Sequence, residues 1–251
     1  MTCIWKQIFI LGLTCAVHCV AAQTTTVVEI YNYDAPPLCI GGQSFSQEYV
    51  GTATISIILP ACAEQVVIYT TGPQSLADMP RIVLSGGPTS RAVKISLGYA
   101  FPLADTPPLR LGRNWGGLDA SGLALSQFYG GINGDLTGSI LVKELFCFDA
   151  GGTLSSTINA FAPGNSGVCV VEVGDISTSG SVVLNTGSLL RAQINRDMLG
   201  LNDVMQGDIS NGINVLGNLG DGTSAPSNGV IRALNGRIGR VEVAGIIRGP
   251  G

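Results

Sequence analysis

A short phrase recurs along the second half of the chain and limits the folds open to it more than any other feature. It consists of a glycine, a small polar residue and an aliphatic residue, followed by a short alternating segment. Its plainest copies are Gly134-Asp135-Leu136, Gly174-Asp175-Ile176 and Gly207-Asp208-Ile209. Variants are Gly187-Ser188-Leu189, Gly217-Asn218-Leu219 and Gly236-Arg237-Ile238. Such self-similarity predicts a solenoid, in which each coil buries its aliphatic row against the next coil.

The segments between the glycines have the pattern of short β-strands. Val241 and Val243 can face inward while Arg240 and Glu242 face outward, which is the two-residue period of a strand. Successive phrases start roughly 10 or 20 residues apart, which suits a coil of about 20 residues. Glycine and asparagine supply the sharp corners that such a coil needs. The sequence therefore predicts an all-β parallel β-helix.

The composition agrees with this class. Charged residues make up 12% of the 251 residues, aromatic residues 6% and hydrophobic residues 45%, and 35 residues are glycine. These proportions favour β structure with many tight turns and argue against a disordered chain. The formal net charge of -4 argues against a polyanionic partner such as nucleic acid.

The first 22 residues have the layout of a secretory signal peptide. Lys6 supplies the positive charge, residues 8–17 form a short apolar core, and Val20-Ala21-Ala22 places small residues ahead of Gln23. A bilayer span takes about 20 apolar residues, so an uncleaved membrane anchor is the weaker alternative. We therefore expect a secreted or cell-surface protein with no membrane span after signal removal.

The rest of the chain is expected to form one β region with an irregular start. Residues 23–115 carry irregular strands and predict an N-terminal β cap or the first irregular coils, and residues 116–251 carry the β-helix repeats. Leu190, Ile194 and Met198 show a helical spacing of four, so residues 195–203 are predicted to be a loop with at most one helical turn. A new phrase starts at Gly245, so the sequence is a fragment or another segment or chain covers that end.

Four cysteines remain after signal removal. They are Cys39, Cys62, Cys147 and Cys169. An even number of cysteines in an exported chain indicates disulfides. Cys39 and Cys62 lie about one coil apart in the sequence, and so do Cys147 and Cys169. This spacing favours pairing Cys39 with Cys62 and Cys147 with Cys169, although four cysteines allow three pairings.

The residues after the phrase glycines are the candidates for metal binding. Asp135, Asp175 and Asp208 would present stacked carboxylates that could hold calcium. The alternative is ordinary turn chemistry, in which each carboxylate accepts nearby backbone N–H groups. The alternative is favoured, so no cofactor is expected. The only histidine, His18, lies in the signal peptide, which excludes histidine-based catalysis in the mature chain.

Two sets of residues are candidates for ligand binding. Arg110, Arg113 and Trp115 lie in a proline-containing stretch, where an arginine beside a tryptophan can bind a sugar ring. Arg237 and Arg240 lie near the end and could form a stripe for an acidic polysaccharide. The alternatives are that Trp115 covers the solenoid wall and that the arginines are solvated.

The runs Gly-Asp-Leu-Thr-Gly-Ser-Ile at 134–140 and Gly-Arg-Ile-Gly-Arg-Val-Glu-Val-Ala-Gly at 236–245 carry a family resemblance. They resemble secreted glycine-rich β-helix repeat proteins of planctomycete-type bacteria, and pectate-lyase-like right-handed β-helices share this architecture. The resemblance covers about residues 120–251. It implies a right-handed parallel β-helix and an export route, and it implies no activity.

Two functions remain open from the sequence. The favoured one is an exported, non-enzymatic β-solenoid with a structural or adhesive role that contacts polysaccharide or other cell-surface components. The alternative is a polysaccharide lyase or hydrolase of the pectate-lyase-like type acting on an acidic polysaccharide, which would need a groove lined by acids and arginines.

Overall fold

The computed structural model describes residues 25–32, 45–50, 52–71, 78–98, 110–112, 114–161, 169–185, 188–204, 208–220 and 229–248. Over these ranges the protein is all-β, with strands β1 to β19 and no helix. It follows that these ranges hold no helix long and apolar enough to cross a lipid bilayer. The predicted signal peptide lies outside them.

One sheet contains eight strands, and all of its neighbouring strands are parallel. In spatial order they are β18 (Val230–Ala233), β16 (Leu201–Val204), β14 (Ser181–Leu184), β12 (Thr157–Ala160), β10 (Ile140–Val142), β8 (Leu118–Leu123), β5 (Arg81–Gly86) and β3 (Thr54–Leu59).

The other sheet contains eleven strands. In spatial order they are β19 (Val241–Val243), β17 (Ile213–Val215), β15 (Leu189–Ile194), β13 (Cys169–Ile176), β11 (Glu144–Leu154), β9 (Ser126–Ile132), β6 (Val93–Leu97), β4 (Ala63–Thr71), β1 (Thr25–Asn32) and β2 (Phe45–Val50). The short strand β7 (Arg110–Leu111) lies off this path and pairs with β9.

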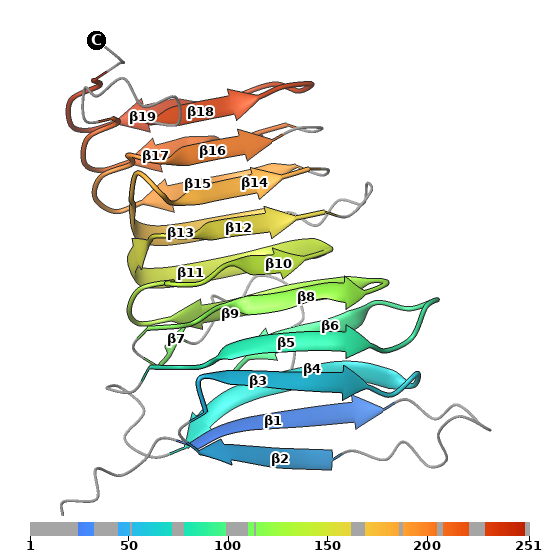
Figure 1. The fold of residues 1–251 in the computed structure, drawn as a ribbon. Helices are drawn as coiled ribbons and strands as arrows, with labels where there is room; N and C mark the ends of the chain where they lie inside the picture. The colour runs from blue at the N-terminus through green and yellow to red at the C-terminus, as the bar shows by residue number, and fades with distance from the viewer. Residues whose placement is uncertain are drawn as a thin grey trace, which may run out of the picture.

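The chain alternates between the two sheets. It runs from β3 to β4, from β5 to β6, from β8 to β9, and so on to β18 and β19, and we call each such passage a coil. Successive coils lie side by side along both sheets, from β3 and β4 at one end to β18 and β19 at the other (Figure 1). The predicted all-β class and parallel pairing are confirmed, and the arrangement is compatible with a β-solenoid.

A third line of contacts joins the coils outside the two sheets. It consists of single parallel pairings from one coil to the next, and we call it the bridge ladder. Its members are Met79, Trp115, Leu136, Leu154, Ile176, Met198, Leu219 and Ile247. A shorter line joins Leu189, Ile209 and Ile238. The aliphatic residues of the repeated phrase fall on these two lines, which is why the phrase recurs once or twice in a coil.

The core is one cluster built from aligned side chains of both sheets and the bridge ladder. One inward row of the eight-stranded sheet runs Ile55, Ile82, Leu118, Ile140, Ile158, Val182, Asn202 and Ile231. Near the middle of the stack the Trp115 ring lies 5.7 Å from Phe128, which lies 6.4 Å from Phe148, and all three are fully buried. Burial of such rows supplies the main favourable free energy of folding.

The first described strands depart from the parallel pattern. β1 pairs antiparallel with both β4 and β2, so two antiparallel strands form this edge of the eleven-stranded sheet. Strands β3 to β6, in contrast, belong to the same two sheets as all later strands. β5 pairs directly with β8, across the boundary expected at residues 115/116. The coils on both sides of that boundary therefore form one stack.

The loop predicted over residues 195–203, with at most one helical turn, agrees with the structure at residues 195–200, which lie in no helix or named strand, and is wrong for residues 201–203, which belong to β16. Met198 belongs to the bridge ladder, and the segment ends in β16. Ile194 lies at the end of β15, and Met198 lies on the next wall of the same coil, in the bridge ladder. Both side chains are buried. Their spacing of four arises because a corner of the coil separates two inward positions.

Candidate functional site

The three aspartates of the repeated phrase do not converge. Asp135 and Asp175 precede the bridge-ladder residues Leu136 and Ile176, which are two coils apart because Leu154 lies between them. Asp208 precedes Ile209 on the shorter line. Throughout the described residues, no three His, Cys, Asp or Glu side chains group closely enough to hold a metal ion. The proposed calcium ligands are therefore not brought together.

Each of these aspartates instead contacts the next coil through a hydrogen bond to its backbone. Asp135 and Asp175 belong to a series that we call the polar ladder, formed by Asn114, Asp135, Thr153, Asp175, Asp197 and Asn218. The Oδ1 atoms accept backbone N–H groups as follows: Asn114 from Asp135 at 3.0 Å, Asp135 from Thr153 at 2.7 Å, Asp175 from Asp197 at 3.0 Å, Asp197 from Asn218 at 2.7 Å, and Asn218 from Ile246 at 3.0 Å. Thr153 Oγ1 donates to Asp175 Oδ2 at 3.4 Å.

The polar ladder completes the backbone pairing that the bridge ladder leaves open. A single bridge satisfies only some of the neighbouring N–H groups, and a buried N–H group without a partner is costly. The shorter line uses the same device, because Ser188 Oγ accepts the N–H of Asp208 at 3.2 Å and Asp208 Oδ1 accepts the N–H of Arg237 at 2.7 Å. The aspartates thus accept backbone N–H groups, as turn chemistry would have them do. The N–H groups, however, belong to the next coil and not to the aspartate's own turn.

The glycine of the phrase makes room for this contact. A Cβ atom at Gly152 would overlap Asp135 Oδ1, and one at Gly217 would overlap Asp197 Oδ1. Arg196 occupies the glycine position of its own coil and forms an ion pair with Asp175. Sequence reasoning missed Asp197 because Arg196 replaces the glycine. Its position, 22 residues after Asp175, was the available signal.

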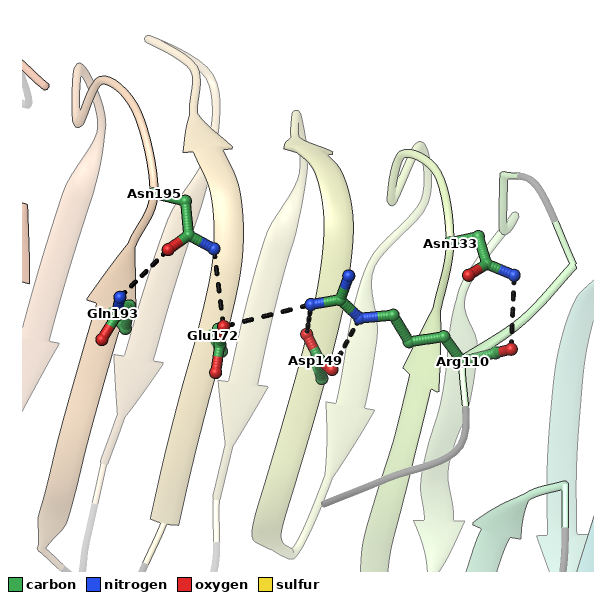
Figure 2. Close-up of polar contacts among 6 residues, drawn as sticks. All are labelled: Arg110, Asn133, Asp149, Glu172, Gln193 and Asn195. Carbon is green, nitrogen blue, oxygen red and sulfur yellow. Dashed lines mark hydrogen bonds and ion pairs between the residues drawn. The ribbon is translucent and has the colours of Figure 1, made fainter. Parts of the chain in front are cut away.

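A different polar set lies on the outer face of the eleven-stranded sheet (Figure 2). The strand register aligns one residue from each of five coils, and we call this set the outer polar row. Its members are Asp149 on β11, Glu172 on β13, Gln193 on β15, Asn214 on β17 and Glu242 on β19. Their inward neighbours Phe148, Val171, Val173 and Ala192 are buried, so alternation turns the row outward.

Arg110 covers the first member of the outer polar row. Its Nε and Nη2 atoms donate to the two carboxylate oxygens of Asp149, both at 2.7 Å, and only 12% of the Asp149 side chain stays exposed. Arg110 pairs with Gly131 on β9, and Asp149 pairs with Gly131 from the other side. Because Gly131 has no side chain, the guanidinium can reach across β9. The hydrogen bonds that Arg110 donates to Asp149 raise the pKa of Arg110, so the guanidinium stays charged.

Glu172 is the more accessible acid beside this pair. Its side chain is 34% exposed and its Oε1 atom lies 4.0 Å from Arg110 Nη2. Asn195 Nδ2 donates to Glu172 Oε1 at 3.5 Å, and Gln193 Nε2 donates to Asn195 Oδ1 at 3.1 Å. These contacts are long or few, so the carboxylate and the two amides keep donors and acceptors for external hydroxyl groups.

Tyr129 and Cys147 lie next to Asp149 on the same face and are uncharged. Burial, with a further contribution from Asp149, raises the pKa of each to about 12. A thiol that stays protonated is a weak nucleophile, so Cys147 has no chemical activation here.

The predicted disulfide between Cys147 and Cys169 is wrong. Cys147 is a free cysteine, and the register sets it opposite Val170, one residue beyond Cys169. Neighbouring residues of a strand alternate between faces, so a spacing of about one coil does not bring two cysteines together. Cys62 is fully buried and disulfide-bonded. Its proposed partner Cys39 lies outside the described residues, so this pairing stays a prediction.

The predicted ligand-binding residues are dispersed. Trp115 is fully buried against Phe128 and cannot stack on a sugar at the surface. Arg113 lies outside the described residues. Arg237 and Arg240 are exposed in the last described coil, where Arg240 pairs with Glu242, far from Arg110 along the stack. Arg110 contacts the outer polar row at Asp149 and Arg240 contacts it at Glu242, and sequence reasoning did not identify the row itself.

Comparison of the chain with models of protein families, with curated proteins and with solved structures finds no match. The resemblance to secreted repeat proteins of planctomycete-type bacteria therefore stays a prediction.

Proposed function

We propose that the coils form a right-handed parallel β-helix and that the chain is an exported, non-enzymatic structural or adhesive element at or beyond the cell surface. The alternation between two parallel sheets supports the architecture. So does the coil length, because polar-ladder contacts up to Asn218 join residues 18 to 22 positions apart. A rod of this kind offers a rigid, regularly spaced surface.

One observation carries the non-enzymatic part of the proposal. The acids of the repeated phrase, which were the best catalytic or metal-binding candidates, accept backbone N–H groups of the next coil. A carboxylate in this role is oriented along the stack and stabilises it, which disfavours its use as a general base or a metal ligand.

The outer polar row is the proposed contact surface. Arg110 binds Asp149 through two hydrogen bonds, whereas the Glu172 carboxylate lies 4.0 Å from Arg110 and stands beside the amides of Gln193 and Asn195. Alternating acceptors and donors at strand spacing suit the hydroxyl groups of a neutral polysaccharide. The negative charge of Glu172 disfavours an acidic polysaccharide.

The alternative is a polysaccharide lyase or hydrolase, and one observation favours it. Asp149 and Glu172 lie on neighbouring strands, which are about 4.8 Å apart, and retaining glycosidases hold their two carboxyl groups at about 5–5.5 Å. Against it, both oxygens of Asp149 are occupied by Arg110. The same ion pair keeps Arg110 charged, so it cannot serve as the base of a lyase.

A polysaccharide panel distinguishes the two functions. Neutral and acidic polysaccharides are offered to the purified protein, and retention, new reducing ends and unsaturated products are measured. We expect retention on neutral chains that falls in Glu172→Gln and Asn195→Ala, with no turnover. The matched control is Glu144→Gln, which changes a hydrogen-bonded acid at the start of β11 outside the row. Turnover that is lost in Asp149→Asn would establish the enzyme and overturn the proposal.

A further inference from the structure

A pocket of about 230 Å³ opens on the wall that the bridge ladder forms, next to Met79. The single parallel bridges of the ladder place Pro80, Gly116 and Thr137, each directly after a ladder residue, at matching positions on three successive coils. Pro80 and Thr137 carry side chains whereas Gly116 carries none, so a gap is left between them. All three residues line the pocket. The hollow is therefore part of the stacked wall and not a feature of one loop.

Asp78 lines this pocket and stands at the polar-ladder position of its coil. It directly precedes the bridge-ladder residue Met79, as Asn114 precedes the next ladder residue. By analogy with the other coils its carboxylate would accept the N–H group of Asn114, but no such hydrogen bond is formed. Within the described residues the exposed Asp78 side chain has neither a hydrogen bond nor an ion pair. The later carboxylates of the polar ladder all bind the next coil, so Asp78 differs in being open to a ligand.

Hydrogen-bond donors line the same pocket. Arg81 uses its Nη2 atom on Asp119 at 3.0 Å, and half of its side chain is exposed, so its other N–H groups remain available. Asn114 uses its Oδ1 atom within the polar ladder, which leaves the two N–H groups of its Nδ2 atom. Thr137 donates its hydroxyl proton to a backbone carbonyl at 3.0 Å and keeps its oxygen as an acceptor. An acceptor and several donors thus share one small cavity.

The lining selects the chemical class of the ligand. Arg81 is paired with Asp119 whereas Asp78 is unpaired, so the local charge disfavours an anionic ligand. Hydroxyl groups can donate to a carboxylate and also accept from an amide or a guanidinium, so they suit both kinds of partner. Ala53 and Pro80 add apolar lining that C–H groups can contact. A neutral compound with several hydroxyl groups fits these features best.

We propose that this cavity, the Asp78 pocket, binds one neutral sugar unit through adjacent hydroxyl groups. Asp78 accepts hydrogen bonds from two neighbouring hydroxyl groups, and Arg81 and Asn114 donate to further hydroxyl oxygens. The pocket lies beside the starts of β3 and β5 in the eight-stranded sheet, whereas the outer polar row lies on the eleven-stranded sheet. It is thus a second site, and its binding does not depend on the polysaccharide contact proposed for the row.

Binding of simple sugars to the purified protein tests the Asp78 pocket. The probes are the methyl glycosides of glucose, galactose, mannose and xylose, with glucuronic acid as the anionic comparison and free glycine as a zwitterion. Saturation-transfer difference NMR detects binding, and titration gives the dissociation constant. We expect at least one neutral glycoside to bind, glucuronic acid to bind more weakly, and Asp78→Asn to weaken binding of the glycoside by more than roughly tenfold.

The variants separate loss of binding from loss of fold. Because the Asp78 side chain has no partner, Asp78→Asn is expected to keep the thermal midpoint of the wild type. Ala53→Leu narrows the pocket at an exposed position and is expected to weaken binding too. Glu64→Gln changes an exposed acid outside the pocket and is the matched control.

Glu172→Gln distinguishes this proposal from the one for the outer polar row. It is expected to leave binding of the glycoside unchanged, even where it abolishes retention on a polysaccharide. The pocket proposal is overturned if no neutral glycoside binds, if glycine binds in place of a sugar, or if Asp78→Asn binds the glycoside as well as Glu64→Gln does.

Discussion

Asp197 Oδ1 accepts the backbone N–H of Asn218 at 2.7 Å, 21 residues further along the chain. One side chain therefore fixes the position of the next coil. Because the same contact recurs with Asp135 and Asp175, the stack is held by directed hydrogen bonds along its third wall as well as by apolar rows.

The first prediction concerns the polar ladder at Asp197. Asp197→Ala leaves the N–H of Asn218 without its acceptor and is expected to lower the free energy of unfolding by about 1–3 kcal/mol, measured by urea denaturation. Asp197→Asn keeps an acceptor oxygen and is expected to lose less than half as much. The exposed Glu64→Ala is the control, with an expected change within about 0.5 kcal/mol. Equal losses in Asp197→Ala and the control would show that the ladder contributes nothing.

The second prediction concerns Asn202, which is buried in the aliphatic row between Val182 and Ile231. Neither its Oδ1 nor its Nδ2 atom has a hydrogen-bond partner, and its side chain is fully buried. A buried amide without partners costs about 1–3 kcal/mol, so Asn202→Val is expected to raise the midpoint of thermal unfolding. The control is Asn159→Val, which removes an amide that does have a partner: Asn159 Oδ1 accepts a hydrogen bond from Asn185 Nδ2 at 2.9 Å. A lower midpoint of thermal unfolding in Asn202→Val would contradict the conclusion that the buried Asn202 amide lacks hydrogen-bond partners.

The third prediction concerns the ion pair between Arg110 and Asp149. Arg110→Ala leaves a carboxylate that is 12% exposed without its partner and is expected to cost about 1–2 kcal/mol in urea denaturation, after allowance for the partial exposure of Arg110. Arg110→Lys is expected to restore only part of this, because an ammonium group does not reproduce the two-pronged contact. Full restoration by lysine would show that charge alone matters here.

The fourth prediction concerns the Cys147 thiol. Its pKa is about 12 in the folded protein and is expected to return to its usual value of 9.0 on unfolding. The folded state therefore holds the proton more tightly, so this contribution to stability is complete below pH 9 and is lost as pH rises towards 12. Iodoacetamide at neutral pH is expected to label Cys147 only in urea. Peptide mass mapping gives the readout, and a disulfide-linked Cys147–Cys169 peptide would contradict the structure.

The sequence predicted the general fold because its repeated phrase has a physical cause. Leu136, Ile176 and Leu219 all follow a glycine and a polar residue, and all three lie on the bridge ladder. The phrase does not distinguish this ladder from the shorter line that contains Ile209, because both need the same small, polar and aliphatic residues. For this reason the sequence places Asp208 in the same set of metal-binding candidates as Asp135 and Asp175, although it lies on the shorter line.

The outer polar row could not be predicted from a local motif. Asp149, Glu172 and Gln193 share no flanking pattern, and their alignment depends on the register in which β11, β13 and β15 pair. The contact of Arg110 with Asp149 further depends on the pairing of β7 with Gly131, which no sequence spacing reveals. The sequence leaves Trp115 between a surface contact for a ligand and a cover over the solenoid wall, because the prolines and arginines before it are typical of a loop. Its place on the bridge ladder turns it inward.

The polar ladder also bears on how a molecule of this shape can change length. Except at Thr153, each coil of the polar ladder presents its successor with the same kind of acceptor that it received from its predecessor. A duplicated or deleted unit of one coil, such as residues 176–197, would therefore meet matching neighbours on both sides. Tandem gene duplication could thus extend the rod in steps of about 4.8 Å without redesigning either junction.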